Sequence, residues 1–476
     1  MNSLKKNIIY NTLYQVLILL VPLVTIPYIS RILGAEGVGI YSYTYSIVYY
    51  FMIISLLGIN NYGNRTIAKM RDDSDLMSRT FWNIYSIQFI MSLIMIIAYT
   101  FYILCFNIEY RDIAFLQIIF IFSSMADINW FFFGLEEFKL TITRSTFLKV
   151  LTLVLIFIIV KESNDLWKYT LIMSISTLIS QLILWPFLFK RVKFIKGMNY
   201  KEIKKQIKPC ITLFVPVIAV SLYKIMDKIM LGHLINATEL GFYEQAEKII
   251  SVPCTIITAL GTVMLPRISN LVSKNNLKQT LKYIEKSINV IMFLAFPMMF
   301  GIIAVSNEFI PLYLGTDFSK SIILLDLLSV TIIFSSFANI IRTEYLLPNE
   351  KDNIYIFSVI GGAIINIIIN FILIPRFMGV GACIGTICAE FFVFSMQAFL
   401  VRKNLPLVNY LKSMIPFFIK SLIMFIVVYS FNIIKIDVYG KIFLQICIGC
   451  LIYVILNTKY INTLVDWKNI GRGKCV

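Results

Sequence analysis

The chain alternates between long apolar runs and short polar connectors along nearly its whole length. The apolar runs are about 18–25 residues long, the length that a helix needs to cross a hydrocarbon core of about 30 Å. About fourteen such runs occur, far more than a single membrane anchor would need. The pattern predicts an all-α polytopic membrane protein. We expect its spans near residues 8–30, 38–59, 81–106, 113–134, 145–160, 167–189, 211–232, 242–264, 287–305, 321–341, 353–374, 382–401, 414–434 and 441–456.

The composition agrees with this pattern. Of the 476 residues, 59% are hydrophobic and 14% are charged, whereas a soluble chain is about half apolar and a quarter charged. Lys5 and Lys6 precede the first apolar run as in a secretory signal, but the run continues to about Ile29 and no small-residue cleavage site follows, so we expect a retained span.

Cys447 and Cys450 lie inside an apolar run with no second pair, so we expect packing residues, with no metal and no bound cofactor.

The positive charges are distributed unevenly between two sets of connectors. The chain has 43 Lys and Arg and a formal net charge of +17. About 30 of these cations fall in every second connector and at the termini, and the positive-inside rule places that side in the cytoplasm. Both termini are therefore expected to be cytoplasmic. A nucleic-acid-binding protein would gather its cations on one soluble face, whereas this spread fits orientation in the membrane and contact with lipid headgroups.

A short connector occurs twice, as LGAEGVGIYSY from Leu33 and within LGHLINATELGFYEQA from Leu231. Both copies begin with Leu-Gly and place an acidic residue shortly before Gly-x-Tyr. Six spans separate them, so both run through the membrane in the same direction. We predict two six-helix lobes related by a parallel repeat, facing a central cavity, although chance recurrence of a short turn is the alternative. The predicted parts are an N-terminal lobe at 1–190, a basic cytoplasmic linker at 191–208, a second lobe at 209–402, and two further helices with a cytoplasmic tail at 403–476.

The sequence around both connectors resembles a known family. The segments IPYISRILGAEGVGIYSY and YKIMDKIMLGHLINATELGFYEQAEKI resemble the oligosaccharide (O-antigen, Wzx-type) flippases of the multidrug/oligosaccharidyl-lipid/polysaccharide (MOP) exporter superfamily. The resemblance covers essentially the whole chain. It implies a non-enzymatic transporter of the bacterial cytoplasmic (inner) membrane. That transporter moves undecaprenyl-pyrophosphate-linked oligosaccharide repeat units by alternating access, for surface polysaccharide synthesis, beside a polysaccharide polymerase and chain-length machinery.

Three charged residues lie within the seventh expected span. Lys224, Asp227 and Lys228 are spaced so that they share one face of a helix. Charges inside a membrane are costly and usually face a cavity or a partner. Because Asp227 can neutralise one lysine and leave one positive charge, we predict a cationic face that binds the pyrophosphate. The alternative is an ion-pair cluster that only fixes the position of this helix.

Two arginines are further candidates for substrate binding. Arg31 ends the first span, after Pro22 and Pro27, which can bend the helix and free backbone carbonyls. Its guanidinium can donate two parallel hydrogen bonds to a phosphate, and an arginine in the matching R-x-x-G position lines the cavity of related lipid-precursor flippases. The alternative for Arg31 is an interfacial side chain that reaches the headgroups. Arg65, at the expected cytoplasmic end of the second span, is a candidate for the first encounter with the substrate.

Several acidic residues are also placed within or beside expected spans. Asp127 in the fourth span and Glu390 in the twelfth could carry protons or pair with a cation of the other lobe. Glu244, Glu247 and Lys248 begin the eighth span near the outer interface, where we expect a solvated helix end.

A sodium site is the last prediction from the residues. Asn366 and Asn370 lie four positions apart in an apolar run, and buried amides need partners. With Asp227, Thr386 and a backbone carbonyl at Ala382 they would form a shell of oxygen ligands, similar to the sodium site of related flippases. Asn370 stands where an acid would be the stronger ligand, so the coupling ion is expected to be Na⁺ or H⁺. The alternative is that the two asparagines hydrogen-bond across helices as packing contacts.

Two other functions are compatible with a polytopic chain. A cation-coupled multidrug exporter of the same superfamily would be expected to have an acidic cavity, whereas the cluster in the seventh span carries two lysines and one acid. An integral-membrane polysaccharide polymerase or ligase usually has a large extracytoplasmic loop, and the longest one expected here, near 306–320, is short. The chain has no G-x-x-x-x-G-K-[ST] motif, so we expect no ATP hydrolysis by this chain.

Overall fold

The computed structural model describes residues 3–106, 109–194, 200–434 and 436–463. Part of the predicted basic linker (195–199) and the end of the tail (464–476) lie outside this range. The described residues form helices and no strands. The α-helices of these residues are α1 (Ser3–Leu56), α2 (Ile59–Met70), α3 (Ser74–Cys105), α4 (Arg111–Leu116), α5 (Ile118–Met125), α6 (Asn129–Gly134), α7 (Phe138–Ile159), α8 (Leu166–Leu182), α9 (Trp185–Leu188), α10 (Tyr200–Leu234), α11 (Ala237–Ser273), α12 (Leu277–Tyr313), α13 (Ser321–Ser329), α14 (Thr331–Ile340), α15 (Asp352–Phe377), α16 (Gly379–Val401), α17 (Leu407–Ser430) and α18 (Val438–Leu456).

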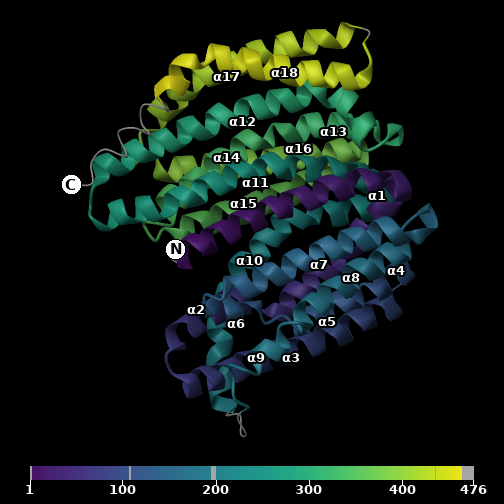
Figure 1. Cartoon of the computed structure of the whole chain (residues 1–476), viewed down its shortest axis with the longest axis vertical. Helices are drawn as coiled ribbons and strands as arrows, with labels where there is room; N and C mark the ends of the chain where they lie inside the picture. Colours follow the sequence, from purple (N-terminus) through teal and green to yellow (C-terminus); the bar gives the residue numbers. More distant parts are fainter. Residues whose placement is uncertain (1–2, 107–108, 195–199, 435, 464–476) are drawn as a thin grey trace. The chain divides into compact units, whose positions relative to one another are not determined.

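These helices confirm the expected all-α polytopic membrane protein. Within the described residues, 13 helices are long and apolar enough to cross a membrane. The first of them, Val21–Met70, contains a bend and includes the last ten residues of the first expected span and the whole of the second. Every expected span therefore falls on one helix or on two or three consecutive helices (Figure 1).

The bend in α1 lies at Gly34. Its φ of 67° and ψ of 179° are not helical, and they separate two helical segments that are otherwise continuous. A positive φ of this size is readily adopted by glycine and is strained for residues with a Cβ. The second residue of the first connector is thus one that the backbone geometry requires to be glycine.

The two copies of the connector pack against each other. A Cβ on Gly39 would lie 1.7 Å from the carbonyl oxygen of Ala237, and a Cβ on Gly241 would lie 1.9 Å from the carbonyl oxygen of Ala35. Gly39 and Gly241 hold the same place in the two copies, as do Ala35 and Ala237. Each glycine therefore meets the backbone of the other copy, the reciprocal contact expected of two segments related by a two-fold axis.

The chain divides into two compact units, 1–244 and 245–476. The first contains α1 to α10 and the beginning of α11, and the second contains the rest of α11 with α12 to α18. The lobe boundaries at 190, 209 and 402 stay predictions.

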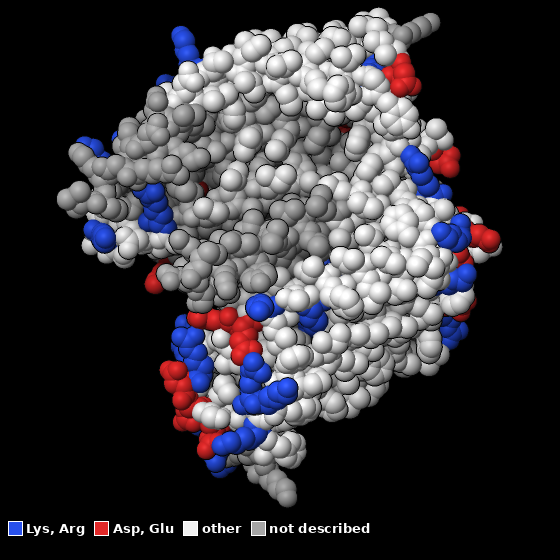
Figure 2. Space-filling model, in the orientation of Figure 1, with Lys and Arg blue, Asp and Glu red and all other residues white. Residues whose placement is uncertain are grey.

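The first unit is organised around an aromatic cluster between α2, α3 and α6. Trp130 is almost fully buried, and its ring stacks on Phe81 with centroids 5.3 Å apart. Gly63 of α2 lies directly over this ring, since a Cβ there would come within 2.4 Å of it. In the part of the chain coloured purple to blue in Figure 1, the charged side chains gather mainly towards the ends of the helices, with a largely uncharged band between them (Figure 2). That distribution is typical of a membrane-spanning unit.

In the second unit, α15 and α16 form a tightly packed helical hairpin that turns at Met378, whose φ is 52°. The two C-terminal helices α17 and α18 pack on α12. The hydroxyl of Tyr453 on α18 donates a 2.8 Å hydrogen bond to the carbonyl of Phe293 on α12.

Candidate functional site

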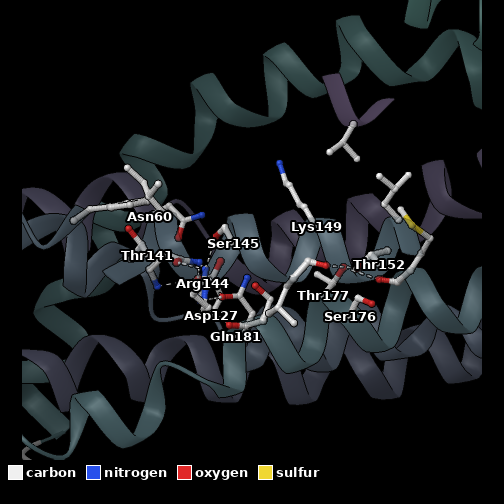
Figure 3. A pocket seen from close by; sticks show the side chains of 18 of the residues that line it. Asn60, Asp127, Thr141, Arg144, Ser145, Lys149, Thr152, Ser176, Thr177 and Gln181 are labelled. Carbon is white, nitrogen blue, oxygen red and sulfur yellow. Dashed lines mark hydrogen bonds between the residues drawn. The ribbon is translucent and has the colours of Figure 1, made fainter. Parts of the chain in front are cut away.

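A groove of about 930 Å³ runs through the first unit, lined by the early part of α1 and by α2, α6, α7 and α8 (Figure 3). Its lining is unusual for a membrane-spanning region because much of it is polar. The polar lining residues are Thr25, Asn60, Asn61, Asn64, Asp127, Asn129, Thr141, Arg144, Ser145, Lys149, Thr152, Ser176, Thr177, Ser180 and Gln181.

The groove follows one face of α7 over most of its length. Its lining residues on this helix extend from Phe138 to Ile156, which at 1.5 Å per residue is about 27 Å. This length is close to the hydrocarbon thickness of a bilayer. Other faces of the same helix expose large apolar side chains, such as Phe147 and Ile158, which suit contact with lipid. The polar face is therefore directed into the groove and could line a path through the membrane.

A break in the fourth span lies beside the groove. Helix α5 ends at Met125 and α6 begins at Asn129. The carbonyls freed at the break are satisfied by side chains: Gln88 Nε2 donates to the carbonyl oxygens of Ser124 and Asp127, each at 2.7 Å, and Trp185 Nε1 donates to the carbonyl oxygen of the intervening Ala126 at 3.0 Å. Interrupted helices of this kind are tolerated in membranes where they are buried in protein or line a cavity, and they recur at transporter binding sites.

The break places Asp127 and Asn129 in the lining of the groove, where the two residues are hydrogen-bonded to each other. The Asp127 Oδ1 accepts hydrogen bonds from the Asn129 backbone N–H at 2.9 Å and from its side-chain Nδ2 at 2.7 Å. The same Nδ2 donates to Gln181 Oε1 of α8 at 2.8 Å. Asp127 thus closes a turn before α6 and orients the amide of Asn129 toward α8.

Arg144 on α7 completes this network and is only 8% exposed. Its Nη1 donates to the Ser180 carbonyl oxygen at 2.6 Å, and its Nη2 donates to Asn129 Oδ1 at 3.0 Å and to Ser145 Oγ at 3.1 Å. These acceptors are uncharged and orient the guanidinium, which also interacts electrostatically with the carboxyl group of Asp127. The geometry presents a fixed cation to the groove.

Lys149 is the second cation of the groove and lies five residues beyond Arg144 on the same helix. It is half-buried, and Figure 3 shows it extending away from the network around Arg144. The groove therefore holds two cationic side chains and one carboxyl group, Asp127, so its lining carries net positive charge.

Sequence reasoning missed Arg144 and Lys149. The expected span of 145–160 began just after Arg144, and the sequence analysis gave no role to Lys149 within it. Both interrupt an apolar run in TRSTFLKVLTLVLIF, and cations within such runs usually face a cavity or a partner. That signal was present but gave no indication of which cation lines the groove.

The charges of the seventh expected span form a different cluster. Lys228 Nζ lies 2.8 Å from Glu244 Oε2, which also accepts a 2.8 Å hydrogen bond from Ser42 Oγ. Asp227 is buried and accepts a 2.8 Å hydrogen bond from the Tyr243 hydroxyl. The expectation of a solvated helix end at Glu244 was wrong, because this residue is only 6% exposed and engaged with two side chains.

The other predicted cavity residues lie outside the groove. Arg31, Arg65 and Lys224 are exposed, and none lines the groove, although Asn64 beside Arg65 does. Glu390 is half-buried on α16 in the second unit. Their roles in substrate binding or coupling stay predictions.

Four of the five predicted sodium ligands lie on the packed pair α15 and α16. Asn370 Nδ2 donates to Asn366 Oδ1 at 3.2 Å, and Thr386 Oγ1 donates to the Ala382 carbonyl oxygen at 3.0 Å. Both asparagines are fully buried. The fifth ligand, Asp227, belongs to the first unit, and the complete site stays a prediction.

Comparison with known proteins is consistent with this architecture. The chain is 23% identical over 410 residues to a protein of Escherichia coli (strain K12) named "Putative O-antigen transporter", covering 85% of this chain and 98% of that protein. Its fold matches that of the lipid II flippase MurJ in an inward closed conformation, with a TM-score of 0.78 at 15% identity over 96% of this chain and 99% of MurJ. It also matches an inward-facing multidrug resistance MATE family transporter of the MOP superfamily, with a TM-score of 0.57 at 14% identity over 81% of this chain and 98% of that transporter.

These matches show that the chain shares the fold of a flippase and of a MOP-superfamily transporter, the fold that the resemblance at the two connectors implied. Residues 4–272, more than half of the chain, also match the model of the polysaccharide biosynthesis protein family. The chain belongs to the polysaccharide biosynthesis protein family.

Proposed function

We propose that this protein is a flippase that moves lipid-linked oligosaccharide repeat units, carried on undecaprenyl pyrophosphate, across the bacterial cytoplasmic membrane by alternating access. The observation that carries the proposal is the groove of about 930 Å³ in the first unit, which presents a buried Arg144 and a half-buried Lys149 along a membrane-spanning helix. A transport role, rather than catalysis, is supported by the family and by the fold shared with transporters.

The chemistry of the groove suits a diphosphate. The Arg144 guanidinium stays charged at any physiological pH and attracts phosphate oxygens electrostatically, while its Nη1 and Nη2 already donate to Ser180, Asn129 and Ser145. The acceptors around Arg144 hold it in one orientation, which lowers the entropy lost when an anion binds. Lys149, about 7.5 Å further along the helix by its rise of 1.5 Å per residue, supplies a second cation for the neighbouring phosphate.

A multidrug exporter of the same superfamily is less well supported. A cationic drug would require a groove whose net charge is negative. The groove instead carries two cations and one carboxyl group, and that carboxyl group, on Asp127, already accepts two hydrogen bonds from Asn129.

The direction of transport requires an energy source that the groove does not supply. We propose coupling to Na⁺ or H⁺; Na⁺ would be bound in the second unit by Asn366, Asn370, the carbonyl of Ala382 and Thr386. The termini would face the cytoplasm, and a polysaccharide polymerase with its chain-length machinery would consume the product on the outer side.

The test is complementation of a bacterial strain that lacks its own flippase for a lipid-linked repeat unit and carries the glycosyltransferases native to this protein. Arg144→Lys keeps the charge but loses the hydrogen bonds to Ser180, Asn129 and Ser145 that fix the cation in place, and we expect surface polysaccharide to fall about tenfold. Arg144→Ala combined with Lys149→Ala should abolish it while the lipid-linked precursor accumulates inside.

The matched control is Lys139→Ala, since Lys139 is exposed at the start of α7 and does not line the groove. This variant should complement as well as the wild type. Full complementation by the Arg144→Ala/Lys149→Ala variant, at normal protein levels in the membrane, would contradict the proposed function.

A further inference from the structure

The groove changes character along its length. Asn60, Asn61 and Asn64 line it from α2, whereas the cations line it from α7. Positions 60, 61 and 64 share one face of a helix. Figure 3 shows Asn60 near Thr141, with Lys149 further along the groove. One end of the groove is therefore rich in uncharged amides, and its middle holds the positive charge.

Two aromatic rings lie at the same end as the amides. Phe133 of α6 and Phe138 of α7 both line the groove, and their rings are nearly parallel, with centroids 5.9 Å apart and an angle of 26° between them. Phe133 keeps 37% of its surface exposed. Trp130, which also lines this end, is fixed by a 3.0 Å hydrogen bond from its Nε1 to Gln88 Oε1. The aromatic surface is thus held in place while part of it stays open.

The amides of this end are available to a ligand. Within the described residues, no hydrogen bond occupies the side chains of Asn60, Asn61 or Asn64. Each amide offers two donors and an acceptor oxygen with two lone pairs. A sugar ring has the complementary form, with hydroxyl groups around its edge that donate and accept hydrogen bonds and C–H groups on its faces that pack on aromatic rings.

We propose that this end of the groove is a subsite for uncharged, hydroxyl-bearing sugar rings, formed by the amides of α2 and the rings of Phe133 and Phe138. The inference rests on the proposed function, in which Arg144 and Lys149 hold the diphosphate. The sugar next to the diphosphate enters the amide end, and the choice of glycan is made there.

The separation of the sugar subsite from the cations that hold the diphosphate has a physical reason. A diphosphate is common to all lipid-linked glycans of this kind, so the cations cannot distinguish one glycan from another. Specificity requires groups whose contacts differ between glycans. A site built to hydrogen-bond a hydroxyl group rejects an analogue that lacks it, because the amides are then left without partners.

The experiment measures binding to the purified full chain in lipid nanodiscs with two probes, undecaprenyl diphosphate and the same lipid carrying one N-acetylglucosamine. The variant Asn60→Ala/Asn61→Ala/Asn64→Ala should bind the sugar-bearing probe about tenfold more weakly, the equivalent of one or two neutral hydrogen bonds. Its affinity for the sugar-free probe should stay within about twofold of the wild type. Arg144→Ala should weaken both probes.

A second variant keeps the test decisive if the triple variant folds poorly. Phe133→Leu preserves an apolar side chain but loses the flat ring, and it should weaken only the sugar-bearing probe. Lys69→Ala is the control, since Lys69 is exposed on α2 and does not line the groove.

The outcomes separate the two proposals. Equal weakening of both probes by the triple variant or by Phe133→Leu, or no weakening of the sugar-bearing probe by either, overturns the sugar subsite and leaves the flippase intact. An Arg144→Ala variant that binds both probes normally overturns the proposed function itself.

Discussion

Removing the carboxylate of Glu244 is expected to destabilise the protein strongly. Its Oε2 lies 2.8 Å from Lys228 Nζ, and the two side chains are only 8% and 17% exposed. At an effective dielectric constant of 20, unit charges at this distance attract by about 6 kcal/mol. Desolvation offsets much of that attraction, so the pair as a whole contributes little net stability. Deleting one partner is different, because it removes the charge nearest to the other partner while that partner stays buried.

We therefore expect Glu244→Ala to lower the free energy of unfolding by about 3–5 kcal/mol. Replacing both partners, as Glu244→Leu with Lys228→Met, should recover most of that loss, since both charges of the pair are then removed together. The measurement is unfolding of the purified protein in lipid–detergent micelles by titration with sodium dodecyl sulfate, followed by tryptophan fluorescence.

An exposed ion pair of the same length serves as the control. Lys193 Nζ and Asp75 Oδ1 are also 2.8 Å apart, but their side chains are 70% and 75% exposed. Water and salt screen such a pair, so Asp75→Ala should leave the unfolding curve nearly unchanged. Two results would refute the reasoning: Glu244→Ala no more damaging than Asp75→Ala, or the double replacement as damaging as Glu244→Ala alone.

Two further predictions concern the fold. Gly39→Ala should reduce the amount of folded protein on size-exclusion chromatography, because its Cβ would overlap the carbonyl of Ala237, whereas Gly301→Ala, with no neighbouring atom within 4 Å, should not; equal yields would argue against the close contact of the connectors. Reporter fusions after Tyr200 and after Val476 should both report a cytoplasmic location, as the positive-inside rule requires, and an extracytoplasmic signal at Tyr200 would overturn the predicted topology.

The helical architecture could be predicted from the sequence because lipid imposes a simple rule on it. Each span must be apolar and long enough to cross the hydrocarbon core, and this rule located the helices along the chain. The repeated connector was also visible as a pattern of Gly and Tyr. Why both copies need these glycines is clear only from the structure, where Gly39 and Gly241 each touch the backbone of the other copy.

The site was harder to predict because it depends on which helix faces which. Lys228 has its carboxylate partner on the next helix, at Glu244, and no spacing rule within one helix reveals such a pair. Arg144 depends on Asn129 and Ser180, which lie on two other helices. The break that exposes Asp127 contains neither Gly nor Pro; side chains of Gln88 and Trp185 stabilise it from elsewhere in the fold.

The most direct test of the central claim is transport by the purified protein in liposomes. A lipid-linked oligosaccharide would be built into both leaflets, and a membrane-impermeant glycosidase would be added outside. With the wild-type protein, we predict that the enzyme reaches the sugar of both leaflets, whereas with Arg144→Ala it reaches the outer leaflet alone, as in protein-free liposomes. Cleavage confined to the outer leaflet with the wild type, with and without Na⁺ and pH gradients, would contradict the account, as would equal rates for the wild type and Arg144→Ala.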